Sequence, residues 1–299
     1  MPASSSSSEL SVLVPALNEG VHLRRTVECV RDTLPGRTQV VVVDDGSDDG
    51  CADFLRRPGA AATLVERPEA GRRLGVVGAR NLAASMATGE TLVFLDAHMR
   101  MPAGWIDPLV EAANDPQVGA ASPAIAVLGR LQSRGYGMRW TDASLSVDWL
   151  PSAGDVPYEV PILPGACVAI RRDTFHAVGG FDGGLAQFGL DDAELSFRLW
   201  RFGYGLRLVP SVVVEHLFRE RHPYPVEWGA VAHNILRVAF LHFGAKRWAA
   251  VVEAMKPHAC FAAALARVTG GDAPSNREHL RRYTARSDDA YFQRFGDIC

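Results

Sequence analysis

Short apolar runs and stretches with helical spacing alternate along the first third of the chain. Residues 10–15, 39–43 and 91–95 are runs of apolar, largely β-branched or aliphatic side chains, the pattern of strands buried on both faces. Apolar positions recur at helical spacing over residues 23–30, and residues 79–87 are strongly helical in composition. Repetition of strand, helix and strand at this spacing predicts a mostly parallel sheet with right-handed crossovers.

Smaller elements complete this half of the chain. Asn18 is expected to cap the first helix. We also expect a helix near residues 51–55, a short strand at 63–66 and a glycine-punctuated loop at 71–78.

The second half contains a helix at 190–202, a last strand at 207–215 and a helix at 231–241. Residues 129–160, rich in glycine, tryptophan and proline, are expected to form an irregular insertion or ribbon. The predicted fold is therefore α/β, with a mostly parallel central sheet flanked by helices, a small antiparallel ribbon and a helical C-terminal tail. The expected organisation is a disordered tail at 1–9, a domain at 10–245 with halves at 10–98 and 99–245, and an extension at 246–299.

Composition narrows the class of protein. With 47% hydrophobic and 22% charged residues over 299 positions, the chain has the composition of an ordinary globular enzyme. A net charge of −3 provides no broad basic field for nucleic acid or anionic membranes, so any phosphate binding has to be local. No run of about 18 apolar residues indicates a spanning helix, and the serine-rich start lacks the regions of a secretory signal. Five scattered cysteines without a Cys-x-x-Cys pair argue against a disulfide framework and favour a reducing cytoplasm.

Two acidic clusters directly follow two of the predicted strands. Asp44 and Asp45 end the run at 39–43, and Asp96-Ala97-His98 ends the run at 91–95. Ligands of such sheets bind outside the carboxyl ends of the strands. Both clusters are therefore expected to face one crevice.

Asp96 and His98 have the spacing and chemistry of metal ligands. Two positions apart in an extended chain, their side chains point to the same side, and carboxylate and imidazole suit Mn²⁺ or Mg²⁺. His216, just past the last predicted strand, is placed to supply a third ligand. The competing interpretation is that Asp96 caps a turn and His98 packs; the second acidic strand end favours the metal site.

Three other clusters each allow two interpretations from spacing alone. Residues 44–47 suit hydrogen bonds to the base and ribose of a nucleotide, or a plain turn with a helix cap. Asp191 and Asp192 open a predicted helix, either as a general base and acceptor contacts or as first-turn caps. The loop at 219–224 concentrates phosphate-binding donors, or is a solvated basic loop.

In their shared order these blocks resemble the GT-A glycosyltransferases, a group with a Rossmann-like fold. Val43-Asp44-Asp45-Gly46-Ser47 resembles the nucleotide turn of the large inverting family 2, and Phe94-Leu95-Asp96-Ala97-His98 resembles the metal motif of the polypeptide N-acetylgalactosaminyltransferases. Further blocks similar to the latter group are Leu17-Asn18-Glu19, Gly78-Ala79-Arg80, Gly180-Phe181-Asp182, residues 194–200, His216-Leu217-Phe218-Arg219, His222-Pro223-Tyr224, Asn234 and Arg237. The resemblance covers residues 10–240.

The resemblance implies a UDP-sugar donor and a divalent metal, Mn²⁺ or Mg²⁺, held by Asp96, His98 and His216. Trp200 would wall the sugar pocket. The loop residues Arg219, His222 and Tyr224 would close over the pyrophosphate. The remaining implied donor contacts are Pro15, Leu17, Glu19, Asp44, Asp45, Arg80 and Asp96.

Two departures from that group change the expectations. Asp191 and Asp192 stand where the retaining enzymes carry a Glu-Asn pair. They look more like the acidic step of inverting family 2 enzymes, whose aspartate deprotonates the acceptor, so Asp192 is the general base if the enzyme inverts. If it retains, Asp191 and Asp192 are contacts of the acceptor and the sugar. The animal members also carry a membrane anchor, a stem and a lectin domain, none of which is visible here, so we expect a bare catalytic domain, bacterial and cytoplasmic.

The sequence thus predicts a glycosyltransferase that moves a hexose or N-acetylhexosamine from a UDP-sugar to a hydroxyl or thiol of a peptide, glycan or small metabolite. One alternative is a nucleotidyltransferase, although residues 13–20 lack its glycine-rich phosphate loop. The other is a non-catalytic nucleotide-binding relative, although no expected acid or metal ligand is missing. No nucleic-acid partner is expected, and the oligomeric state stays open.

Overall fold

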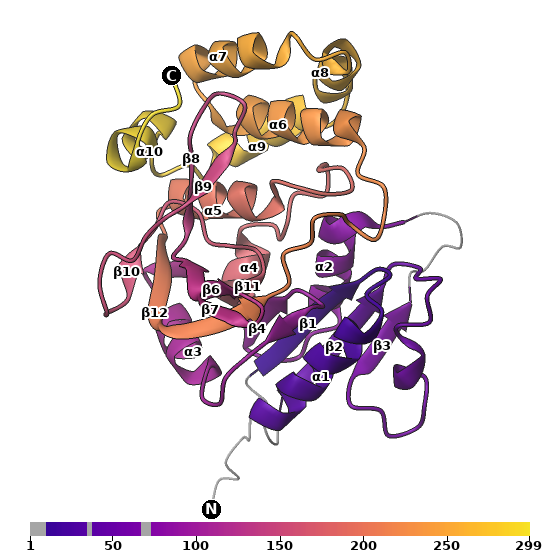
Figure 1. Cartoon of the computed structure of the whole chain (residues 1–299). Helices are drawn as coiled ribbons and strands as arrows, with labels where there is room; N and C mark the ends of the chain where they lie inside the picture. Colours follow the sequence, from indigo (N-terminus) through magenta and orange to yellow (C-terminus); the bar gives the residue numbers. More distant parts are fainter. Residues whose placement is uncertain (1–9, 35–37, 67–72) are drawn as a thin grey trace, which may run out of the picture.

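The computed structural model describes residues 10–34, 38–66 and 73–299, and one large sheet runs through it (Figure 1). Its strands are β1 (Leu10–Ala16), β2 (Thr38–Asp44), β3 (Thr63–Glu66), β4 (Thr91–Leu95), β5 (Met99–Arg100), β6 (Val118–Val127), β7 (Arg130–Gly135), β10 (Tyr158–Glu159), β11 (Cys167–Arg171) and β12 (Gly205–His216). The order across the sheet is β10-β12-β6-β11-β4-β1-β2-β3, with β5 paired to β12 and β7 to β6.

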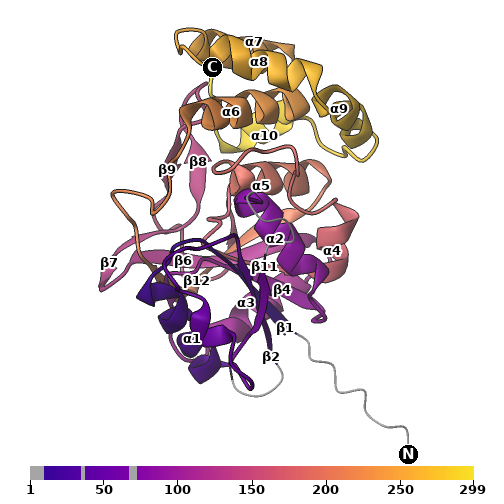
Figure 2. The same cartoon turned by 90° about the vertical axis from the view of Figure 1, so that its right-hand side faces the viewer.

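Helices cover both faces of this sheet (Figure 2). They are α1 (Val21–Thr33), α2 (Gly75–Ser85), α3 (Ile106–Asn114), α4 (Arg172–Ala177), α5 (Asp191–Arg201), α6 (Trp228–His242), α7 (Ala245–Met255), α8 (Phe261–Gly270), α9 (Ala273–Arg281) and α10 (Asp288–Phe295), with a 3₁₀ turn at Asp53–Leu55. One hydrophobic cluster joins α1 and α3 to the sheet, and the other joins it to α2, α4 and α5. The helices α6–α10 extend this second layer and share its core.

The apolar runs form strands buried on both faces, as their composition predicts. In β1, Val12 and Val14 belong to the cluster under α1, whereas Leu13 between them belongs to the opposite cluster. This alternation follows from the two-residue period of a strand. The pairs β1–β2, β1–β4 and β2–β3 are parallel, so the prediction of a mostly parallel sheet is confirmed.

An antiparallel strand interrupts the parallel order. β11 pairs antiparallel with β4 and with β6, while β6 and β12 pair parallel with each other. The ribbon expected within residues 129–160 is present as β8 (Met138–Trp140) and β9 (Val147–Trp149), which pair antiparallel.

Some local predictions were wrong. Asn18 adopts a positive φ of 56° and accepts a hydrogen bond from the backbone of Asp48, so it ties two loops together and does not cap α1. Helix α2 begins at Gly75 and not near residue 79, and the 51–55 segment is a 3₁₀ turn. The helix α3 and the long buried strand β6 had no counterpart in the prediction.

Other expectations lie outside what the structure tests. The predicted tail at 1–9 and the start of the loop at 71–78 lie outside the described residues. The boundary near residue 245 stays a prediction, although α7–α10 contribute side chains to the same core cluster as α5. Within the described ranges, no helix is both long enough and apolar enough to cross a membrane.

Candidate active site

The register of the sheet brings the predicted metal ligands together. β4 ends at Leu95, and the chain continues through Asp96 and His98 into β5. In the antiparallel pair of β5 and β12, Met99 lies opposite His216, and Leu217 donates a backbone hydrogen bond to the carbonyl of His98 at 3.1 Å. Ligand positions more than a hundred residues apart therefore meet at one end of the sheet.

Asp96, His98 and His216 form a compact group of potential metal ligands, with one donor atom from each within 4.8 Å of the others. The Nε2 atoms of the two imidazoles are 3.1 Å apart, and Nε2 of His216 lies 3.3 Å from the Asp96 carboxylate. Ligand atoms at about 2.1 Å from an octahedral cation are separated by about 3 Å. The spacing and the mixed nitrogen and oxygen donors fit a divalent cation.

The orientation of His98 also fits a metal ligand. Its Nδ1 lies 3.0 Å from the Glu19 carboxylate, which keeps the proton on Nδ1 and leaves the Nε2 lone pair facing His216. Glu19 accepts a second hydrogen bond from Arg219. Burial raises the pKa of Glu19, but the hydrogen bonds and charges of His98 and Arg219 outweigh it and hold that pKa below its usual range. Glu19 is thus an ionised carboxylate that joins the candidate ligand His98 to the 219–224 loop.

Arg80, buried on α2, connects the ligand group to the acidic pair. Its guanidinium donates to the Asp96 carboxylate at 2.9 Å, to the carbonyl of Gly165 at 2.8 Å and to the Asp191 carboxylate. Burial disfavours the charged form of Arg80, but the surrounding carboxylates outweigh it and raise its pKa. Asp191 therefore has a buried cationic partner, but burial outweighs the charge of Arg80 and raises the pKa of Asp191.

Asp192 makes no ion pair within the residues that the structure describes, although the charge of nearby Arg80 acts to lower its pKa. Its carboxylate accepts hydrogen bonds from the backbone of Gly165 at 2.9 Å and of Ala193 at 2.8 Å. Burial, followed by the charge of Asp191, raises the pKa of Asp192 to about 6. A carboxylate with a raised pKa is suited to accept a hydrogen bond or a proton from a substrate.

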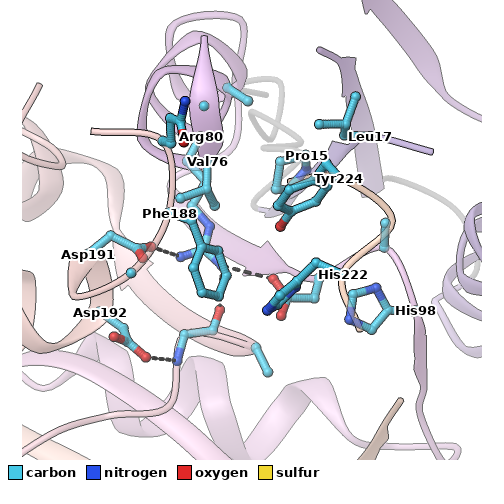
Figure 3. Close-up of a pocket in the computed structure, with 18 of the residues that line it drawn as sticks. Pro15, Leu17, Val76, Arg80, His98, Phe188, Asp191, Asp192, His222 and Tyr224 are labelled. Atoms are coloured by element: carbon cyan, nitrogen blue, oxygen red, sulfur yellow. Dashed lines mark hydrogen bonds and ion pairs between the residues drawn. The ribbon is translucent and has the colours of Figure 1, made fainter. Parts of the chain in front are cut away.

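A cavity of about 690 Å³ opens over these groups. Asp191 and Asp192 lie on the opposite side from Pro15 and Leu17, and Phe188 lies between the acidic pair and His222 (Figure 3). The predicted site residues that line the cavity are Pro15, Leu17, Glu19, Asp45, Arg80, Asp96, His98, Asp191, Asp192, His216, Arg219, His222 and Tyr224. A volume of this size matches a small-molecule or cofactor site.

Two predicted contacts, those of Asp44 and Trp200, need correction. The Asp44 carboxylate accepts hydrogen bonds from the backbones of Gly46 and Ser47, so it fixes the turn and does not line the cavity. Trp200 is buried on the far side of α5, where its ring packs on Tyr291 of the C-terminal region. The helical period turns position 200 toward the core, away from the helix start that carries Asp191.

Asp45 combines two roles. It lines the cavity, and its carboxylate accepts hydrogen bonds from the backbones of Leu74 and Gly75 at 2.6 and 3.0 Å, at the start of α2. The turn after β2 therefore helps to place the helix that carries Arg80.

Phe188 is a cavity residue that the sequence interpretation missed. Its ring packs 4.6 Å from the ring of His222 and 6.4 Å from that of Tyr224, so it forms the wall opposite the 222–224 segment. The half-exposed rings of Trp149 and Phe218 meet at 5.9 Å and also line the cavity. The sequence signal for Phe188, an aromatic residue three positions before an acidic pair, is too common to have been specific.

Comparisons with known proteins found two matching family profiles and a set of similar sequences. The profile of Glycosyl transferase family 2 matches residues 11–179, and that described as the N-terminal domain of galactosyltransferase matches residues 152–223. Polypeptide N-acetylgalactosaminyltransferase 3 of Taeniopygia guttata is 32% identical over 244 residues, covering 73% of this chain and 39% of the relative. Polypeptide N-acetylgalactosaminyltransferase 10 of Homo sapiens is 31% identical over 251 residues, covering 77% and 41%. The chain thus spans about two fifths of the length of these relatives.

Solved structures show the same fold. GalNAc-T7, crystallised with UDP, GalNAc and Mn²⁺, superposes with a TM-score of 0.79 at 21% identity, covering 97% of this chain and 56% of that one. The mannosyltransferase PcManGT of Pyrobaculum calidifontis, in complex with GDP-Man and Mn²⁺, gives a TM-score of 0.53 at 23% identity, covering 95% and 85%. The GT-A fold expected from the sequence is confirmed. With the family 2 profile matching more than half of its residues, the chain belongs to glycosyl transferase family 2.

Proposed function

We propose that this chain transfers a sugar, an N-acetylhexosamine or a hexose, from a UDP-sugar to an acceptor hydroxyl, with Mn²⁺ or Mg²⁺ as its cofactor. The carrying observation is the group of Asp96, His98 and His216, which faces a cavity that the acidic pair lines from the other side. A divalent cation bound there neutralises the charge that develops on a diphosphate leaving group. The similar sequences are named N-acetylgalactosaminyltransferases, and GalNAc-T7 was crystallised with UDP and Mn²⁺. Both observations support this choice of donor and metal.

We assign the other cavity residues to contacts with the diphosphate, the transferred sugar and the acceptor. Arg219, His222 and Tyr224 belong to one short segment that lines the cavity, which suits them to cover the diphosphate. We assign Asp191 to the transferred sugar and Asp192 to the acceptor hydroxyl, because the guanidinium of Arg80 already pairs with Asp191 whereas the hydrogen bonds to Asp192 come from backbone amides.

Polypeptides are the acceptor class that we favour. The rings of Trp149 and Phe218 form an apolar rim at the cavity and remain half-exposed, as a surface that receives a flexible chain requires. The names of the relatives agree with this class.

We place the protein in the cytoplasm, because all five cysteines are free thiols.

The test is release of UDP from a panel of UDP-sugars, with GDP-mannose as the competing donor, in the presence of Mn²⁺ or of a chelator. We expect turnover of a UDP-sugar that disappears on chelation and returns with Mn²⁺. His216→Ala should abolish it, and His258→Ala, at an exposed position outside the cavity, should leave it unchanged. Equal turnover with and without metal would contradict the proposal.

A second measurement identifies the product. Peptide, glycan and small-molecule arrays are screened with the donor found above, and NMR of the anomeric proton gives the configuration of the new bond. A retained configuration fits Asp191 and Asp192 as contacts of sugar and acceptor. An inverted configuration makes Asp192 the general base.

A further inference from the structure

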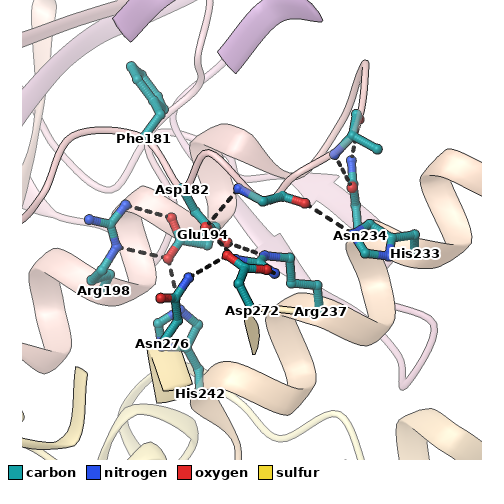
Figure 4. A network of polar contacts seen from close by, with 12 residues as sticks. Phe181, Asp182, Glu194, Arg198, His233, Asn234, Arg237, His242, Asp272 and Asn276 are labelled. Atoms are coloured by element: carbon teal, nitrogen blue, oxygen red, sulfur yellow. Dashed lines mark hydrogen bonds and ion pairs between the residues drawn. The ribbon is translucent and has the colours of Figure 1, made fainter. Parts of the chain in front are cut away.

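Asn234 on helix α6 holds the loop that carries Phe188. Its side chain is fully buried and makes four hydrogen bonds to that loop. Figure 4 shows Asn234 on the same helix as His233 and Arg237. The Oδ1 atom accepts from the backbone of Ala186 at 2.7 Å. The Nδ2 atom donates to the carbonyls of Ala186, Phe188 and Gly189 at 2.8, 3.1 and 3.0 Å. One side chain thus bonds the backbone at three of the four loop positions from 186 to 189.

The held loop is conformationally unusual. Gln187 and Leu190 have positive φ values of 41° and 65°, although neither is glycine. Side chains with a β-carbon avoid this region, so such conformations persist only where the surroundings impose them. Without the contacts from Asn234, the backbone would relax to other conformations.

The same loop touches the other parts of the cavity. The carbonyl of Gln187 accepts a hydrogen bond from the backbone of Val76 at 3.0 Å, at the start of the helix that carries Arg80. The ring of Phe188 packs against His222, and the loop then leads directly into Asp191 at the start of α5. A displacement of this loop would move the wall of the cavity.

Arg237, one helical turn after Asn234, fixes the beginning of this segment. It donates to both carboxylate oxygens of Asp182 at 2.6 and 2.8 Å and to those of Asp272 on the C-terminal side at 2.6 and 3.0 Å. A β-carbon on Gly184 would lie 1.9 Å from the Arg237 guanidinium carbon, so the segment lies flat against this side chain. The C-terminal helices are thereby linked to the loop.

We propose that Asn234 is a positioning residue that keeps Phe188 against the 222–224 segment, and that α6, braced by Asp272, is the support of this cavity wall. The identity of the ligand in the cavity rests on the function proposed above; the mechanical role of Asn234 does not. When the loop is released, only a fraction of the molecules presents a complete cavity, and apparent affinity falls by that fraction.

The test compares Asn234→Ala and the milder Asn234→Ser with the control Asn114→Ala. Asn114 is an exposed asparagine at the end of α3 and does not line the cavity. We expect Asn234→Ala to weaken Mn²⁺-dependent UDP binding about tenfold, with KM for the donor rising more than kcat falls. Asn234→Ser should give an intermediate effect, and the control none. A role confined to global stability would lower kcat through loss of folded protein and leave KM unchanged.

Hydrogen exchange of the loop provides a readout that needs no ligand. In Asn234→Ala the amide of Ala186 and its neighbours through residue 190 should exchange at least tenfold faster than in the control, with α5 unchanged. If these amides keep their protection in both Asn234 variants, the proposal is overturned. Faster exchange in a protein that turns over no UDP-sugar would instead refute the proposed function and leave the role of Asn234 intact.

A double-mutant cycle with Phe188→Ala shows whether Asn234 acts through that ring. We expect the two substitutions together to weaken UDP binding no more than Phe188→Ala does by itself. Additive effects on binding would mean that Asn234 acts by another route and would overturn the proposal.

Discussion

The guanidinium of Arg80 pairs with one oxygen of the Asp96 carboxylate at 2.9 Å and leaves the other oxygen facing His216 at 3.3 Å. Asp96 is thus oriented by a helix on one side and directed into the ligand group on the other. Burial raises the pKa of Asp96, but the hydrogen bond from His216 and the charge of Arg80 outweigh it and lower that pKa. A metal-ligand carboxylate that remains ionised needs such support inside a protein.

Arg80→Met should therefore destabilise the protein. It leaves the carboxylates of Asp96 and Asp191 without their cation, and breaking a buried pair costs about 3 kcal/mol. Urea unfolding measures this loss. Arg56→Met, whose pair with Glu66 lies at the surface, is the control and should cost less than about 1 kcal/mol. Equal losses in the two variants would show that Arg80 is not an essential counter-ion.

Removal of the Glu19 carboxylate should weaken metal binding. In Glu19→Ala the Nδ1 of His98 loses the partner that fixes its tautomer, and loss of such support lowers metal affinity by roughly 10- to 100-fold. Titration of Mn²⁺ followed by calorimetry measures the change. Glu28→Ala, on the exposed side of α1, is the matched control. An unchanged Mn²⁺ affinity in Glu19→Ala would exclude this role.

The raised pKa of Asp192 predicts a pH dependence of both activity and stability. As pH rises through about 6 the carboxyl ionises, so transfer should increase over that range if an ionised Asp192 receives the acceptor proton or hydroxyl. Because the folded state holds this proton longer than the unfolded chain, Asp192 stabilises the fold below about pH 4 and loses that contribution by about pH 6. The free energy of unfolding of wild type relative to Asp192→Asn should fall by roughly 2 kcal/mol over this window. A constant difference would contradict the shift.

The pKa of Glu194 is shifted in the opposite direction to that of Asp192, so its effect on stability has the opposite dependence on pH. Its carboxylate is fully buried between Arg198 and His242, at 2.7 and 2.8 Å. Burial raises its pKa, but the charge of Arg198 and the hydrogen bond of His242 outweigh it and lower the pKa to about 2. The stabilisation it gives is complete above the unfolded pKa of about 4.5 and is lost as pH falls toward 2.

Glu194→Gln should accordingly cost about 3 kcal/mol at neutral pH, because it leaves a buried Arg198 uncompensated. Urea unfolding at pH 7 and at pH 3 measures the loss, which should shrink at the lower pH. Glu253→Gln, in an exposed helical pair with Lys256, should change stability by less than about 0.5 kcal/mol. A loss that does not depend on pH would show that the charge of Glu194 is not the cause.

The sequence predicted the site best where local order carries the signal. The Asp-x-His step at a strand end and the acidic pair at a helix start depend on neighbours in the chain, and the structure brings both to one cavity. The assignments of Asp44 and Trp200 failed because the direction of a side chain depends on the exact turn geometry and helix phase. Strand β6 was not predicted, although it is buried along nine of its ten positions.

The parallel sheet, the residues of the ligand group and the family resemblance could be predicted from the sequence. Each depends on short segments of the chain, namely the strand patterns and the polar residues that follow them. Other contacts became visible only in the tertiary structure. Phe188 packs against His222 as a wall of the cavity, and Glu19 hydrogen-bonds His98. Asn234 and Arg237 hydrogen-bond the loop at 182–190. These contacts join residues 34 to 79 positions apart, and the loop also adopts backbone conformations that residue propensities disfavour. Long-range packing imposes them, and no short segment contains that information.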